Sequence, residues 1–168
     1  MWGASAADTR TSGIELKEYE DKKFAQSYVA TKLPKMLSDV ETVFVSFGYD
    51  DKLWRVAAVS RNFENDPSGI SVRARYDELA SVLAEKYGKG QSAHDQDREM
   101  WKSSTEFVMG IKQGRSNWFT NFDTNLLKIQ LGILAVSSST AAWRITIENK
   151  PLRANFGSGK KAQEKNVL

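Results

Sequence analysis

A single histidine, His94, is the residue of this chain best suited to acid–base or metal chemistry. It lies in the polar residues 91–97 with Asp95 beside it, so a metal site or a proton-transferring His–Asp pair has to be considered. General acid–base catalysis requires groups that converge within hydrogen-bond distance in a protected cleft, and neighbours in a polar loop do not meet that requirement. We therefore expect His94 to be a solvated loop residue. The alternative from the enzyme class is a small hydrolase that uses His94 with Glu99 or Glu106.

Other polar segments could also support chemistry, but each lacks part of what that chemistry needs. Asp50-Asp51 and residues 64–66 offer carboxylates for a hard cation, yet neither matches an EF-hand loop and both have the composition of turns. Residues 157–161 lack the Ser or Thr and the following helix of a phosphate-binding loop. The hydroxyls of residues 137–140 have no base to activate them. We expect no catalytic residue, no metal and no cofactor, and predict a protein that is not an enzyme.

An aromatic segment is the most distinctive group of side chains, with Trp118, Phe119 and Phe122 following Arg115. Side chains of adjacent strand residues point to opposite faces, so Trp118 and Phe119 cannot both enter one core. Aromatic residues and arginine dominate the binding energy of protein interfaces. We therefore predict a partner-binding surface of Arg115, Trp118, Phe119 and Phe122. The alternative is that both faces of this strand are covered within the protein.

Alternating apolar and polar residues predict the strands that must position these side chains. Four of them form two hairpins, at residues 43–47 with 53–60 and at residues 127–135 with 143–147. Residues 100–111 and 117–122 are predicted as two further strands, which makes the second half a four-strand meander. A weaker pattern favours a strand at residues 28–33.

A helix is predicted for residues 71–87, because apolar residues recur there with a period near 3.6 and Gly88 suits the helix end. Ser5, with Asp8 three residues later, predicts one short helix at residues 5–11. Residues 152–168 show no apolar periodicity and are predicted to be a flexible basic tail.

The composition fits one domain with a real core, since the chain has 168 residues of which 40% are hydrophobic. The 24 Lys and Arg against 21 Asp and Glu give a net charge of +3, which does not favour a nucleic-acid-binding protein. The absence of cysteine excludes disulfides and thiolate chemistry. No stretch reaches the roughly 18 apolar residues of a membrane span. The compartment stays open: the bacterial periplasm or envelope if a signal peptide has been removed, and the cytoplasm otherwise.

The order of several short motifs resembles a group of small bacterial proteins of unassigned function. The motifs are Trp2-Gly3-Ala4-Ser5 with Gly13-Ile14, Leu33-Pro34, a strand around Phe44, the Leu53 strand with Val56, Tyr76-Asp77-Glu78-Leu79 leading to Glu85-Lys86-Tyr87-Gly88, and Trp101. The opening is also similar to the short helix-then-sheet unit of outer-membrane assembly lipoproteins and of beta-lactamase inhibitor proteins, which are binding proteins. The resemblance implies a binding role by analogy of fold, and a fold alone does not fix function.

These observations predict an α+β fold with a mainly antiparallel sheet of five to seven strands, one long helix packed on one face and a short N-terminal helix. Residues 1–151 are expected to form a single domain and residues 152–168 the tail. We expect a non-enzymatic protein-binding module of the inhibitor, immunity or envelope accessory type, and the alternative within binding is a small-ligand domain. The expected partner is another protein and not a specific nucleic acid, and the oligomeric state stays open.

Overall fold

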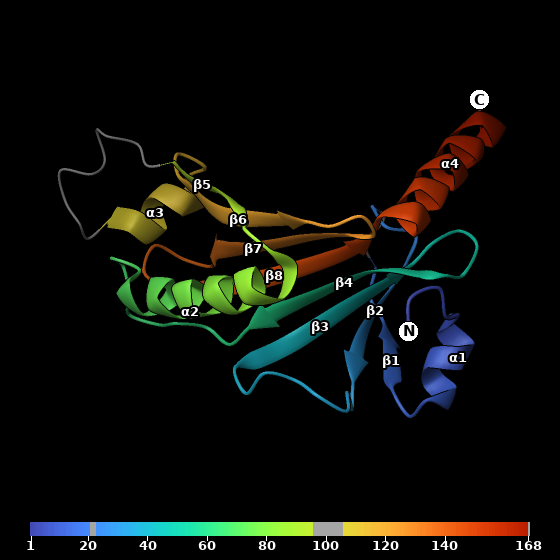
Figure 1. Ribbon diagram of the computed structural model, residues 1–168, viewed down its shortest axis with the longest axis horizontal. Helices are drawn as coiled ribbons and strands as arrows, with labels where there is room; N and C mark the ends of the chain where they lie inside the picture. Colours follow the sequence, from blue (N-terminus) through green and yellow to red (C-terminus); the bar gives the residue numbers. More distant parts are fainter. Residues whose placement is uncertain (21–22, 96–105, 168) are drawn as a thin grey trace. The chain divides into compact units, whose positions relative to one another are not determined.

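The computed structural model describes residues 1–20, 23–95 and 106–167, and these residues form an α+β fold (Figure 1). Eight strands form one antiparallel sheet in the order β1-β2-β3-β4-β8-β7-β6-β5, so the sheet is larger than the predicted five to seven strands. The described elements, in chain order, are α1 (Ala6–Thr11), β1 (Glu15–Glu18), β2 (Gln26–Thr31), β3 (Val40–Phe47), β4 (Leu53–Ser60), α2 (Ile70–Tyr87), β5 (Gln91–Asp95), α3 (Phe107–Lys112), β6 (Asn117–Asp123), β7 (Leu127–Ala135), β8 (Ala141–Asn149) and α4 (Lys150–Val167).

A helix followed by four strands occurs twice along the chain, before the C-terminal helix. Helix α1 precedes β1 to β4, and α2 precedes β5 to β8, with α3 between β5 and β6. Internal contacts divide the chain into two compact units. Unit 1 comprises Met1–Ala58, Asn125–Lys128 and Thr146–Leu168, and unit 2 comprises Val59–Thr124 and Ile129–Ile145. Helices α1 and α4 therefore belong to unit 1, and α2 and α3 belong to unit 2.

The opening motif of the chain is tied to the start of β4 in unit 1. Ser5 and Asp8 form the capping box of the predicted short helix, and hydrogen bonds from Ser5 lower the pKa of the Asp8 carboxyl. The backbone N–H of Leu53 donates to the carbonyl of Ala4 at 2.9 Å, and the carbonyl of Leu53 accepts from the N–H of Gly3 at 3.0 Å. Gly3 adopts a φ of 79°, which favours glycine. These contacts fix the position of α1 next to β4 within unit 1.

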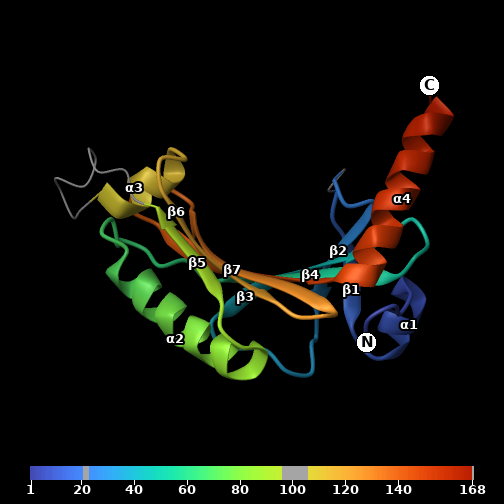
Figure 2. The same cartoon turned by 45° about the horizontal axis from the view of Figure 1, so that its top comes forward.

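Lys150–Val167 form helix α4, whereas a flexible tail is predicted from the sequence for residues 152–168. Its residue Phe156 is 9% exposed, and its ring stacks on Trp54 with centroids 4.7 Å apart and on Tyr49 with centroids 5.5 Å apart. A Cβ atom at Gly159 would approach the Tyr49 ring to 2.8 Å, so a glycine permits this close packing. The second half of α4 extends away from the strands of its unit (Figures 1 and 2). One aromatic side chain thus holds the helix.

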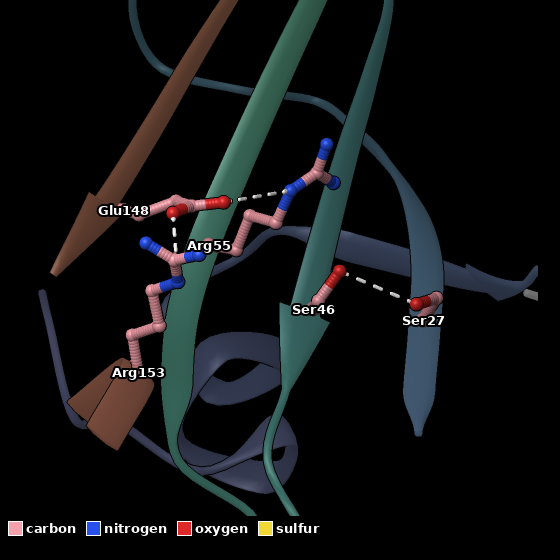
Figure 3. A network of polar contacts seen from close by, with 5 residues as sticks. All are labelled: Ser27, Ser46, Arg55, Glu148 and Arg153. Carbon is pink, nitrogen blue, oxygen red and sulfur yellow. Dashed lines mark hydrogen bonds and ion pairs between the residues drawn. The ribbon is translucent and has the colours of Figure 1, made fainter. Parts of the chain in front are cut away.

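Ion pairs reinforce the first turn of α4. Figure 3 shows Glu148 of β8 between Arg55 of β4 and Arg153 of α4. The carboxylate lies 3.7 Å from Nε of Arg55 and 3.3 Å from Nε of Arg153. The side chains of Glu148 and Arg55 are only 16% and 12% exposed, so water screens this pair less than an exposed one.

A buried pair of hydroxyl groups joins strands β2 and β3. Figure 3 shows Ser27 of β2 facing Ser46 of β3, and their hydroxyl oxygens lie 3.3 Å apart.

Helix α2 closely matches the helix predicted for residues 71–87. Val72, Tyr76 and Leu79 are buried, and this spacing of four and three residues places them on one face. Gly88 ends the helix with a φ of 89°, as expected. The buried face contacts β6, so α2 covers one side of that strand.

The start of α2 is capped from outside the helix. The carboxylate of Asp66 accepts hydrogen bonds from the N–H groups of Ile70 at 2.8 Å, Ser71 at 2.9 Å and Val72 at 3.2 Å. The first N–H groups of a helix have no partner within it, and a negative charge there also favours the helix dipole. Asp66 is only 7% exposed. Its role is therefore to hold the first turn of α2.

Two predictions about the strands need correction. Residues 91–95, expected in a polar loop, form the edge strand β5. The charged residues 15–18, for which no element is predicted, form β1 at the other edge. Residues 107–112, expected within a strand at 100–111, form helix α3, and residues 100–105 lie outside the described part of the chain. The two predicted hairpins are confirmed as β3–β4 and β7–β8.

Candidate functional site

The faces of strand β6 separate its aromatic residues. Trp118, Thr120 and Phe122 lie on the face covered by α2, because Thr120 bonds to Tyr76 of that helix and strand side chains alternate. Phe119 therefore points to the opposite face, where its Cβ lies 3.4 Å from the position a Cβ would take at Gly132 of β7. The expectation that Trp118 and Phe119 point in opposite directions agrees with this geometry.

Trp118 is held by aromatic and cationic groups from three other elements. The ring of His94 on β5 stacks on it with centroids 4.0 Å apart and planes 4° from parallel. Phe107 of α3 meets it edge-on with centroids 5.3 Å apart. The guanidinium carbon of Arg73 on α2 lies 5.7 Å from the Trp118 ring centroid and 4.8 Å from that of Phe107. We call these four residues, Arg73, His94, Phe107 and Trp118, the Trp118 cluster.

The Trp118 cluster is partly open to solvent. His94 is exposed, Arg73 and Trp118 are half-buried, and Phe107 is buried at 1% exposure. Cation–π contacts of this kind are worth roughly 0.5–2 kcal/mol, and aromatic pairs add roughly 0.5–1.5 kcal/mol. The contacts therefore hold the indole in one orientation while leaving part of it accessible.

A chain of hydroxyl groups runs under the cluster. The Tyr76 hydroxyl lies 2.6 Å from Oγ1 of Thr120 and 3.3 Å from Nε2 of His94, and Oγ of Ser92 lies 2.8 Å from Oγ1 of Thr120. Burial raises the pKa of Tyr76 to about 12, so its hydroxyl stays protonated at neutral pH. Among the described residues no carboxylate bonds to this row of groups, so the Tyr76–His94 pair lacks the third group that would orient His94 as a base. These hydroxyl groups position the imidazole of His94, and the Trp118 ring stacks on that imidazole.

His94 makes the stability of the protein depend on pH. Burial lowers the pKa of its imidazole below the ordinary value of 6.5, and the nearby carboxylates of Asp77 and Asp95 oppose this in part. The unfolded chain therefore binds a proton at a higher pH than the folded one. The contribution of neutral His94 to the free energy of unfolding is fully present above pH 6.5, and it decreases as the pH drops below that value.

We expect the free energy of unfolding to decrease between pH 7.5 and pH 5.5, and expect a His94→Gln variant to lose less over the same interval. The chain has one histidine, so no other histidine contributes. Urea denaturation at each pH measures the two profiles. Parallel profiles would show that protonation of His94 is not coupled to folding.

The four residues predicted to bind a partner do not form one surface. Phe122 is 1% exposed and belongs to the core of unit 2. Arg115 is exposed in the turn after α3, and Phe119 is half-buried on the face of β6 opposite Trp118. Of the four, only Trp118 belongs to the Trp118 cluster. Arg73 and Phe107 are neighbours of Trp118 that no sequence pattern predicts, and His94 lies on strand β5 instead of in the predicted loop.

The remaining candidates take structural positions. Glu106 precedes α3 and is exposed, and Glu99 lies outside the described residues. Asp51 accepts a hydrogen bond from the N–H of Ala6 at 3.1 Å, and Asp50 pairs with Lys52 at 3.8 Å. Residues 157–161 lie inside α4, and residues 137–140 form the turn between β7 and β8.

Within residues 1–20, 23–95 and 106–167, no three acidic, histidine or cysteine side chains are grouped so that they could hold a metal ion. None of the described helices is both long and apolar enough to cross a membrane. No family model, no curated protein and no solved structure matches the chain. The function must therefore be argued from the residues themselves.

Proposed function

We propose that this protein is a non-enzymatic binding module whose partner is another protein, of the inhibitor, immunity or envelope accessory type. The observation that carries the proposal is the half-buried indole of Trp118, fixed by His94 and Phe107 and flanked by Arg73. A side chain already held in its bound orientation loses little conformational freedom on binding. The cluster is therefore prepared for contact with a partner.

The residue types of the Trp118 cluster also favour protein recognition. Tryptophan and arginine are the types enriched among residues that dominate interface energetics. The contact would include Trp118 and the exposed His94, with the charged head of Arg73 beside them. Of the four residues predicted from the sequence to bind a partner, only Trp118 belongs to this proposal. Phe122 lies in the core, Phe119 on the opposite face of β6, and Arg115 in a separate turn.

Two alanine variants on adjacent positions of β6 test the proposal. We expect Trp118→Ala to weaken the complex with the partner by about 2 kcal/mol, which is roughly 30-fold in Kd. Phe119→Ala is the matched control, since it removes an aromatic ring from the same strand on the opposite face. Calorimetric titration with a partner captured from lysate measures the affinities, and a thermal melt of each variant verifies folding.

Unchanged affinity for a folded Trp118→Ala variant would contradict the proposal. So would a loss confined to Phe119→Ala, because it would place the partner on the other face of β6. Arg73→Gln supplies a second variant that leaves the indole in place, and we expect a smaller loss of affinity for it.

A further inference from the structure

Helix α4 concentrates the positive charge of the chain. It holds five cationic residues and one acidic residue, so its net charge is +4, whereas the whole chain carries +3. The residues outside α4 therefore carry a net charge of −1 together. Charge gathered on one element decides which molecules that surface attracts, even where the net charge of the whole protein is small.

The exposed cationic side chains of α4 lie on one side of the helix. At 3.6 residues per turn they share an arc of about 140° over a length of about 18 Å. We call them the α4 stripe: Arg153, Lys160, Lys161 and Lys165.

Two members of the α4 stripe have acidic partners and two do not. Arg153 pairs with Glu148, and Lys160 pairs with Glu164 at 3.9 Å. The side chains of Arg153, Lys160 and Glu164 are at least half exposed, so water screens these pairs and leaves the cations accessible. Lys161 and Lys165 are one helical turn apart and have no acidic partner within the described part of the chain.

The docking of α4 leaves the stripe outside. Asn149, at the end of β8, accepts a hydrogen bond from the N–H of Leu152 at 3.1 Å and so caps the first turn. The docked side of the helix consists of Leu152, Phe156 and Gly159, which pack near Gly3, on Trp54 and on Tyr49, respectively, and all three fall outside the arc of the stripe. The second half of α4 extends away from the strands of its unit (Figure 2). The stripe is therefore presented in a fixed direction, which lowers the entropic cost of binding.

The composition of α4 favours duplex nucleic acid over other anionic surfaces. A helix that lies in a membrane needs an accessible apolar face, and the apolar side of α4 is used for docking. Single-stranded nucleic acid is bound through aromatic side chains on which bases stack, and Phe156, the one aromatic residue of α4, is buried. Protein surfaces usually mix both signs of charge. A duplex instead offers a rod of one sign, with one negative charge per roughly 1.7 Å, which matches a straight row of cations.

We propose that the α4 stripe binds the phosphate backbone of double-stranded nucleic acid without sequence preference. Contacts to phosphates position a protein on the duplex but carry no sequence information. The expected affinity is that of non-specific binding, with a dissociation constant of roughly 1–100 µM at physiological salt. The binding is independent of the proposed function, because α4 belongs to unit 1 and the Trp118 cluster lies on elements of unit 2. Either proposal can therefore fail without the other.

The salt dependence of binding tests the proposal. Fluorescence anisotropy of a labelled DNA duplex of about 20 base pairs, titrated with the full chain at about 40 to 150 mM salt, measures the binding constants. On duplex DNA, each neutralised phosphate contributes about −0.9 to the slope of log K against log salt concentration. A double variant with Lys161→Gln and Lys165→Gln removes two such contacts. We therefore expect its slope to be shallower by about 1.8 and its affinity at about 40 mM salt to fall at least 30-fold.

A second double variant with the same net charge is the matched control. Lys17→Gln and Lys89→Gln remove two exposed lysines outside α4, and we expect the slope to stay near that of the unmodified protein. Lys161→Arg with Lys165→Arg keeps both charges and is expected to keep the binding. A thermal melt of each variant verifies folding.

Three results would overturn the proposal. The first is the absence of duplex binding at about 40 mM salt, where phosphate contacts are strong. The second is an equal loss for the Lys17 and Lys89 variant, because net charge and not the α4 stripe would then cause the binding. The third is tighter binding to polyglutamate or to phosphatidylserine vesicles than to the duplex, which would assign the stripe to an acidic protein or to a membrane surface.

Discussion

Replacement of Phe156 by alanine will release helix α4 from the rest of unit 1. Among the described side chains of this 18-residue helix, Phe156 alone belongs to the buried hydrophobic residues, and it stacks on Trp54 and on Tyr49. Loss of such a buried ring costs about 3–5 kcal/mol. The helix cannot compensate, because Gly157 and Gly159 each cost about 1 kcal/mol in a helix interior and isolated helices of this length are marginal in water.

Hydrogen exchange and limited trypsin digestion measure the release. In the variant we expect the amides of α4 to exchange rapidly and cleavage after Lys160 and Lys161 to accelerate, while the strands stay protected. Asn155→Ala is the control, since Asn155 is the exposed neighbour of Phe156 on the same helix. Equal protection of α4 in both variants would show that the aromatic stack does not dock the helix.

Replacement of Asp66 by alanine will destabilise the protein by about 3 kcal/mol. The change removes a charged acceptor from three N–H groups at the start of α2, and each loses a charge-assisted hydrogen bond. Asp66→Asn keeps one acceptor oxygen without the charge, so we expect it to recover part of the loss. Guanidinium denaturation with matched m-values measures the difference.

The neighbouring exposed residue Glu64 offers the control for Asp66. We expect Glu64→Ala to change the free energy of unfolding by no more than about 0.5 kcal/mol. A loss for Asp66→Ala as small as that for Glu64→Ala would mean that the carboxylate contributes nothing to the start of α2. The result would also reopen the question of what this buried acidic residue does.

The predicted elements that the structure confirms are those in which one face is apolar. Strands β7 and β8 bury Ile129, Leu131, Ile133 and Trp143, so alternation in the sequence follows the core directly. Strands β1 and β5 were missed because an edge strand gains its stability from backbone pairing with one neighbour, and its polar side chains leave no apolar alternation. Register and pairing are properties of the sheet, and no local pattern reports them.

Two helices show where periodicity misleads. The segment around Phe107 alternates over too few residues to separate strand from helix, and α3 buries the adjacent Phe107 and Val108, which is not a strand pattern. Among the described side chains of α4 only Phe156 is buried, so the segment shows no apolar periodicity, which is why a flexible tail is predicted there. Its docking depends on Trp54 and Tyr49, which are distant in sequence, so tertiary contacts override the local propensity.

The candidate site could be predicted only in part for the same reason. The opposed directions of Trp118 and Phe119 follow from strand geometry alone. The contribution of His94 requires the pairing of β5 with β6, in which His94 lies opposite Trp118, and that of Arg73 requires α2 to cross the same face. The residues next to Trp118 in the sequence give no indication that His94 and Arg73 are its neighbours in the structure.

Site-directed photo-crosslinking tests the proposed binding surface most directly. A benzophenone amino acid is placed at position 94, beside Trp118, or at position 117, which is also exposed but lies on the opposite face of β6. If the partner contacts the Trp118 cluster, irradiation of the complex will join the partner to the chain from position 94 and not from position 117. Crosslinks that form only from position 117 would place the partner on the other face and contradict the account.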